Sequence, residues 1–153
     1  MRDAFGGTFV MYMIIIFVVL FVTFMAETLK YVQAYRAKNA IINYIEQYEG
    51  FNTQVKTKIE GTETEPQSGY LSRLAYNSSS VVTANENIPT SAGQTYCSGT
   101  YGYCVELEYY EHNQAYYKVT TYVSLDFTNI LSLGPLYIPV SGETRLVTFD
   151  GNI

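Results

Sequence analysis

TFVMYMIIIFVVLFVTFMA, residues 8–26, decides the fold of this 153-residue chain. The stretch contains no charged residue, and as a helix with about 1.5 Å of rise per residue it spans roughly the 30 Å hydrocarbon core of a bilayer. The core of a protein this small cannot surround it on every side. We therefore expect these residues to cross a membrane, or to pack against the same stretch of neighbouring copies. The side chains expected at that helix–helix contact are large and apolar: Phe9, Ile14, Phe17, Phe21 and Phe24.

The helical pattern continues beyond the apolar stretch, in ETLKYVQAYRAKNAIINYIEQYEG (residues 27–50). An apolar stripe at helical spacing, with polar residues opposite, predicts an amphipathic stalk that ends with Gly50 at the C′ position. We expect one helix from about Thr8 to Glu49; the alternative is a break near Glu27, followed by a separate surface helix. The stripe expected to pack against the rest of the protein is Ala34, Ala37, Ile41, Ile45 and Tyr48.

Composition excludes several classes of function. The net charge of −5 and the nine Lys and Arg residues provide no basic surface for nucleic acid. The sequence contains neither a nucleophile elbow nor a phosphate-binding loop, and its single histidine, His112, lies in an expected hairpin turn. We therefore expect neither an enzyme nor a cofactor or metal site. Sixteen tyrosines and no tryptophan favour instead a protein whose surfaces are interfaces, because tyrosine combines a large flat ring with a polar tip.

Two features of the sequence give opposite indications of membrane orientation. Lys30, Arg36 and Lys38 follow the apolar stretch, and such basic residues favour a cytoplasmic body. Cys97 and Cys104 enclose the short loop SGTYGY, and nothing else in the chain gives them chemistry, so we expect a disulfide formed in an oxidising compartment. We give the cysteines more weight, and expect a single-pass membrane protein with its body outside the cytoplasm.

The remainder of the chain is typical of a small antiparallel sheet preceded by a connecting region. Residues 51–100 show no sustained period, and we treat them as the connection. In residues 101–110 and 115–127 apolar and polar side chains alternate, which predicts a hairpin, and PLYIPVSGETRLVTF predicts one or two more strands with Pro139 at an edge or bulge. A sheet of three or four strands has one apolar face to bury, and the helical stripe is its partner. The expected fold class is α+β: a long N-terminal helix packed by a small antiparallel sheet head (residues 101–153).

These features together resemble the type IV pilin architecture, and more specifically the TadE-like pilins of tight-adherence systems. The similarity covers residues 6–50 and 117–147: Gly7 before the apolar run, the AYRAKNAIINYIEQYEG stalk, and VTTYVSLDF followed after a proline-containing loop by LYIPVSGETRLV. It implies a leader (residues 1–7) that a prepilin peptidase removes between Gly7 and Thr8. It also implies assembly with copies of itself or other pilins into an extracellular filament, driven by a separate assembly ATPase.

The sequence departs from many pilins at one position. They carry a glutamate five residues after the cut, where this chain has Tyr12 counting from Thr8, or Met11 counting from Gly7. The alternative is a single-pass anchor that does not polymerise, and that holds a scaffold or binding domain of a secretion or conjugation apparatus outside the cytoplasm. In a filament, the further residues expected at subunit contacts are Glu27 at the membrane boundary and three tyrosines on the polar face of the hairpin, Tyr110, Tyr116 and Tyr122.

Overall fold

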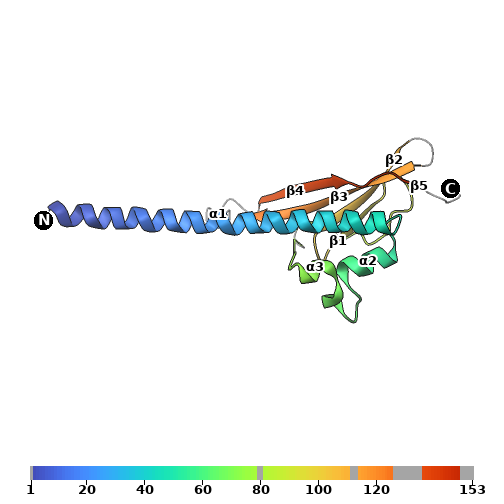
Figure 1. The fold of residues 1–153 in the computed structure, drawn as a ribbon, viewed down its shortest axis with the longest axis horizontal. Helices are drawn as coiled ribbons and strands as arrows, with labels where there is room; N and C mark the ends of the chain where they lie inside the picture. The colour runs from blue at the N-terminus through green and yellow to red at the C-terminus, as the bar shows by residue number, and fades with distance from the viewer. Residues whose placement is uncertain (1, 79–80, 111–113, 126–135, 149–153) are drawn as a thin grey trace.

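The computed structural model of the chain describes residues 2–78, 81–110, 114–125 and 136–148. Its longest element is one 46-residue helix, α1 (Arg2–Gln47), which runs without a break past Glu27 (Figure 1). The predicted single helix is therefore confirmed, and the alternative with a break near Glu27 is wrong. The described helix begins at Arg2 rather than at Thr8, so residues 2–7 of the predicted leader lie within it.

The C-terminus of α1 differs by one residue from the prediction. The left-handed residue is Glu49, with φ of 53°, rather than Gly50. The N–H of Gly50 donates a hydrogen bond to the carbonyl oxygen of Ile45 at 2.9 Å, which closes the last turn as a C″ residue does. Gly50 itself has φ of 148°, and an added Cβ would lie 3.3 Å from the hydroxyl of Tyr117. Glycine is therefore favoured one position later than we expected.

The first part of the region that we treated as a connection forms the lower layer of the head. It contains α2 (Thr53–Glu60), the 3₁₀ turn η1 (Pro66–Ser68) and α3 (Tyr70–Arg73). Asn52 caps α2, because its side-chain oxygen accepts a hydrogen bond from the N–H of Val55 at 3.0 Å. Helices α2 and α3 bury apolar side chains beneath α1 and the sheet (Figure 1). The buried apolar side chains of residues 51–76 are Phe51, Val55, Ile59, Leu71 and Tyr76.

The sheet is antiparallel and has five strands in the order β1-β2-β3-β4, with β5 also paired to β3. The predicted hairpin is β2 and β3, and Pro139 lies in the edge strand β4 as expected. The prediction of three or four strands missed β1, a strand too short to show a period. The strands are β1 (Thr95–Ser98), β2 (Tyr103–Tyr110), β3 (Gln114–Leu125), β4 (Leu136–Glu143) and β5 (Val147–Thr148).

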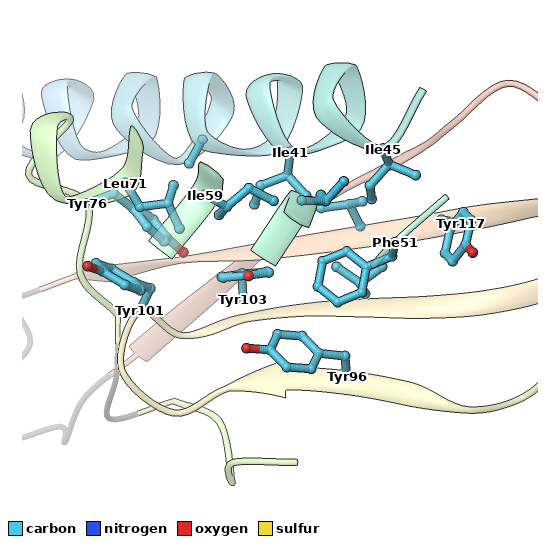
Figure 2. Close-up of a cluster of buried hydrophobic side chains, with 14 of the residues drawn as sticks. Ile41, Ile45, Phe51, Ile59, Leu71, Tyr76, Tyr96, Tyr101, Tyr103 and Tyr117 are labelled. Atoms are coloured by element: carbon cyan, nitrogen blue, oxygen red, sulfur yellow. The ribbon is translucent and has the colours of Figure 1, made fainter. Parts of the chain in front are cut away.

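The second half of α1 packs across β3 and β4. The small side chains of Ala34 and Ala37 let the strand approach closely, so that the Thr121 hydroxyl donates a hydrogen bond to the carbonyl oxygen of Ala34 at 3.1 Å. Figure 2 shows Ile41 and Ile45 pointing from the helix into the buried cluster. Four members of the predicted stripe are at most 1% exposed, and Tyr48 is half-buried at its end. The fold is thus the expected α+β arrangement of a long helix packed by a small sheet.

Candidate membrane and assembly surface

The N-terminal half of α1 is an exposed apolar rod. By length and composition this helix can cross a membrane, and no part of its apolar window is buried by the rest of the protein. The head leaves this half of the helix uncovered in every direction (Figure 1). The side chains predicted at helix–helix contacts are therefore 54–71% exposed: Phe9, Ile14, Phe17, Phe21 and Phe24.

The predicted cleavage junction lies within the first turns of this helix. Gly7 is exposed, and a Cβ added to it would meet nothing within 4 Å. A peptidase that cuts between Gly7 and Thr8 would therefore meet a helical backbone with open space around the glycine. Tyr12, at the position where many pilins carry glutamate, is 63% exposed and brings no charge to the helix.

The apolar rod ends at an ion pair. The Nζ of Lys30 lies 3.4 Å from one carboxylate oxygen of Glu27, whose side chain is only 12% exposed. The other carboxylate oxygen is buried and has no hydrogen-bond partner in the described part of the chain. Within the rod, the Thr23 hydroxyl donates to the carbonyl oxygen of Val19 at 2.9 Å, so it is bonded to its own helix. The first charge after the span is thus partly neutralised by its own helix.

The outer face of the sheet carries acidic and tyrosine side chains, as the alternation in the sequence predicts. The Tyr116 hydroxyl donates a hydrogen bond to the carboxylate of Glu108, and the Nζ of Lys118 lies 3.9 Å from the other oxygen of that carboxylate. The hydrogen bond to Glu108 raises the pKa of Tyr116 to about 12. Tyr122 is half-buried on the same face, and the side chain of Tyr110 lies outside the described residues. Tyr116 and Tyr122 are therefore only partly available to a partner.

Cys97 and Cys104 form the predicted disulfide. They are directly opposite one another in the register of β1 and β2, so the bond closes the turn between these strands. A loop of this length contributes about 2 to 3 kcal/mol when it is closed. Bonds of this kind persist in oxidising compartments and are rare in the cytosol.

A shallow groove of about 390 Å³ runs along α1 beside α3. Its walls combine aromatic rings with polar groups, and two of the rings, Tyr31 and Tyr35, are 49% and 47% exposed. The Nζ of Lys38 lies 4.4 Å from the centroid of the Tyr35 ring. The groove is a mixed surface that continues the exposed rod along the helix into the head. No pattern in the sequence predicts it. Its other walls include Arg36, Ala40, Asn43 and Tyr70.

A buried cluster of a carboxylate and tyrosines joins α2 to the sheet. One carboxylate oxygen of Glu60 accepts hydrogen bonds from the hydroxyls of Tyr96 and Tyr103, each at 2.7 Å. Burial, followed by the charge of Glu60, raises the pKa of Tyr103 well above its ordinary value. No local pattern in the sequence indicates this cluster, because Glu60 precedes its two partners by 36 and 43 positions. The cluster holds the lower layer against the sheet.

Comparisons with protein-family models, with curated proteins and with solved structures find no match. Among the residues that the structure describes, no group of three or more His, Cys, Asp or Glu side chains is placed to hold a metal ion.

Proposed function

We propose that this protein is a pilin-like subunit, held in a membrane by the N-terminal half of α1 and assembled with copies of itself or other pilins into an extracellular filament. The observation that carries this proposal is the opposite exposure of the two halves of α1. The large apolar side chains from Phe9 to Met25 are exposed, whereas Ala34, Ile41 and Ile45 are covered by the sheet and the short helices. An apolar rod that projects from a folded head needs lipid or neighbouring rods around it.

The energetics of the rod favour assembly that is driven from outside the subunit. Away from lipid, each Å² of apolar surface covered by a neighbouring rod contributes about 25 cal/mol. While the rod lies in lipid that gain is small, because lipid tails are as apolar as the side chains of a neighbour. Moving subunits from the membrane into a filament therefore requires work. The sequence has no phosphate-binding loop, so we assign that work to a separate ATPase.

The groove along α1 supplies a second contact at the level of the head. The groove and the rod lie on the same helix, so a neighbouring subunit that packs against the rod would also lie close to the groove. The exposed rings of Tyr31 and Tyr35 offer the flat area with polar tips that is enriched at interfaces. We assign the groove to a neighbouring subunit.

The disulfide supports a body that lies outside the cytoplasm. Cys97 and Cys104 are bonded across adjacent strands, and the described part of the chain has no free cysteine. Because such bonds need an oxidising compartment, we propose that the head crosses the membrane before assembly. The basic residues that follow the rod remain the opposing indication.

A comparison of sheared surface filaments with the membrane fraction tests the proposal. Electron microscopy should show filaments, and mass spectrometry should find this chain in them. Ala40→Glu places a charge in the groove, and we expect it to leave the amount in the membrane unchanged while filaments are lost. The matched control is Ala92→Glu, at an exposed alanine outside the groove, which should leave both unchanged. Absence of the unmodified chain from all filaments would contradict the proposal.

The second candidate is a single-pass anchor that does not polymerise, as part of a secretion or conjugation apparatus. The observation that favours it is Tyr12, which supplies no carboxylate to neutralise the new amino terminus of a neighbouring subunit. In that case the chain would be found in the membrane fraction only, with Met1 retained, and Ala40→Glu would change neither its amount nor its distribution.

A further inference from the structure

The groove lies on the side of α1 that faces away from the sheet. Residues three or four positions apart share one face of a helix, and the buried stripe from Ala34 to Ile45 marks the face that packs on the sheet. Arg36, Asn39 and Asn43 line the groove, roughly half a turn away from this stripe. Arg36 is exposed and forms no ion pair within the part of the chain that the structure describes. The groove therefore carries a positive charge that its own subunit does not neutralise.

The outer face of the sheet carries the opposite charge. Lys118 of β3 is paired with Glu106 of β2 and with Glu143 of β4. A third carboxylate, that of Glu108, lies 3.9 Å from the Nζ of Lys118. The buried Val119 alternates with Lys118, so these charged side chains point away from α1. Three carboxylates and one ammonium group leave two negative charges on this surface, which we call the acidic face (Glu106, Glu108 and Glu143).

The groove and the acidic face lie at different heights along α1. A Cβ added to Gly142 would lie 3.0 Å from side-chain atoms of both Lys38 and Ile42, so Gly142 is level with the turn between them. Figure 1 shows β4 running in the same direction as α1, so Glu143 follows at about the level of Ile42. From Arg36 to Ile42 the helix rises about 9 Å at 1.5 Å per residue. An acidic face that meets Arg36 of another copy therefore belongs to a subunit displaced along the helix by about 9 Å.

We propose that the acidic face of a second copy occupies the groove, with Glu106 and Glu143 of that copy close to Arg36. Charge complementarity favours this occupant, because an excess of carboxylates meets a guanidinium that has no partner in its own subunit. Tyrosine rings border both surfaces, Tyr35 in the groove and Tyr116 beside the acidic face, and such rings are enriched at interfaces. The inference rests on the proposed filament and names the surface of the neighbour that enters the groove.

A contact between these two surfaces can be repeated from copy to copy. The groove and the acidic face lie on opposite sides of the subunit, so a copy whose acidic face is bound still offers its groove to the next copy. Contacts between two different patches of one chain give rings when the rotation closes and open helical filaments when it does not. A displacement of about 9 Å along the axis at every step prevents closure into a ring.

Exchange of charge between the two surfaces tests the contact. The full chain is made in cells with its disulfide formed, and its amount in sheared filaments is compared with its amount in the membrane fraction. We expect Arg36→Glu to lower the filament amount at least about tenfold, because like charges then face each other, and Arg36→Glu with Glu143→Arg to recover it severalfold. The control is Lys58→Glu, the same change of charge at an exposed position of α2 outside the groove, which should leave filaments unchanged.

Cross-linking detects the same contact without a change of charge. Asn39→Cys places a thiol in the groove, and Ser141→Cys places one at an exposed position next to Glu143 on the same face. The two native cysteines form a disulfide and do not react with maleimides. A short bis-maleimide added to filaments of the double variant should give a ladder of covalent dimers and longer oligomers. The control combines Asn39→Cys with Gln67→Cys, an exposed position of η1 on the α1 side of the sheet, and should give monomers.

The two experiments separate this contact from the proposed function. Filaments that contain the double cysteine variant but give no ladder would overturn the contact and leave the proposed function standing. Failure of Glu143→Arg to recover filaments, with the double charge variant at its normal amount in the membrane, would also overturn the contact. The ladder decides if that variant does not reach the membrane. Absence of the unmodified chain from all filaments would overturn the contact and the proposed function together.

Discussion

The hydroxyl oxygen of Tyr76 lies 2.9 Å from the main-chain nitrogen of Tyr122. Strand β2 begins at Tyr103, opposite Thr121, so Tyr122 has no partner in β2. The hydroxyls of Tyr76 and Ser78 replace that partner, and Ser78 donates to the carbonyl oxygen of Tyr122 at 2.8 Å. The main-chain N–H and C=O of Tyr122 therefore point away from β4. Pro139, which lies opposite Tyr122 in β4, has no N–H, and none is needed for hydrogen bonding between β3 and β4 at this position. The segment after α3 thus provides the hydrogen bonds to Tyr122 on one side of β3, and Pro139 lies opposite Tyr122 on the other side.

Removal of one hydroxyl should reveal the contribution of this contact. We expect Tyr76→Phe to lower the free energy of unfolding of the head by roughly 1–3 kcal/mol, because it leaves the main-chain N–H of Tyr122 without its hydrogen-bond partner. The control is Tyr35→Phe at a 47% exposed ring, which should change stability by less than about 0.5 kcal/mol. Urea titration in mild detergent, followed by the near-ultraviolet circular dichroism of the tyrosines, measures both. Equal midpoints for the two variants would contradict the assignment.

Alkaline pH should destabilise the head through its buried tyrosines. Burial raises the pKa of Tyr76 and of Tyr103 above the ordinary value, so these rings keep their protons in the folded state when the unfolded chain has lost them. Their contribution is complete below pH about 10 and falls as pH rises further, by up to about 1.4 kcal/mol per pH unit for each ring. Urea midpoints measured across this range should decrease, and less steeply in Tyr103→Phe. A urea midpoint that does not change above pH about 10 would contradict the raised pKa values of these buried tyrosines.

Two glycines with similar backbones should differ sharply in their tolerance of alanine. Gly93 and Gly102 have φ of 78° and 71°, so alanine is strained at both, by roughly 1–2 kcal/mol. An added Cβ meets nothing within 4 Å at Gly93, whereas at Gly102 it would lie 1.9 Å from the carbonyl oxygen of Ser78. Gly102→Ala should therefore cost at least roughly 1–3 kcal/mol more than Gly93→Ala in the same urea titration. Similar losses in the two variants would mean that Ser78 and Gly102 are not in close contact.

A charge in the rod should prevent stable insertion. Val18 is 51% exposed near the centre of the apolar stretch, and an arginine there makes insertion less favourable by roughly 3 kcal/mol. The matched control is Asn43→Arg, at an exposed position of the same helix beside the head. Immunoblots of the membrane fraction should show Val18→Arg strongly reduced and Asn43→Arg at the normal amount. Normal accumulation of Val18→Arg in the membrane would argue against a membrane span.

The parts of the fold that could be predicted from the sequence are those with a sustained period. The stripe from Ala34 to Ile45 marks the covered side of α1, and the alternation from Tyr103 to Leu107 marks the buried face of β2. In both cases one face of the element packs against the same neighbouring element along its length. The apolar residues therefore recur at a regular spacing, which can be recognised in a short stretch of sequence.

The remaining features depend on single residues that are distant in sequence. Glu60 receives the hydroxyls of two tyrosines, and nothing in TQVKTKIE indicates which of its polar side chains is needed there. Strand β1 is only four residues long, and its place in the sheet depends on pairing with β2. The groove beside Tyr70 forms only when α3 folds back on α1, so its lining residues carry no shared pattern.

The N-terminal sequence of this chain, taken from sheared and purified surface filaments, tests the central claim most directly. A pilin-like subunit is predicted to be abundant in those filaments and to begin at Thr8, with Gly7 and the residues before it removed. Recovery of the chain only from the membrane fraction, with Met1 retained, would contradict it.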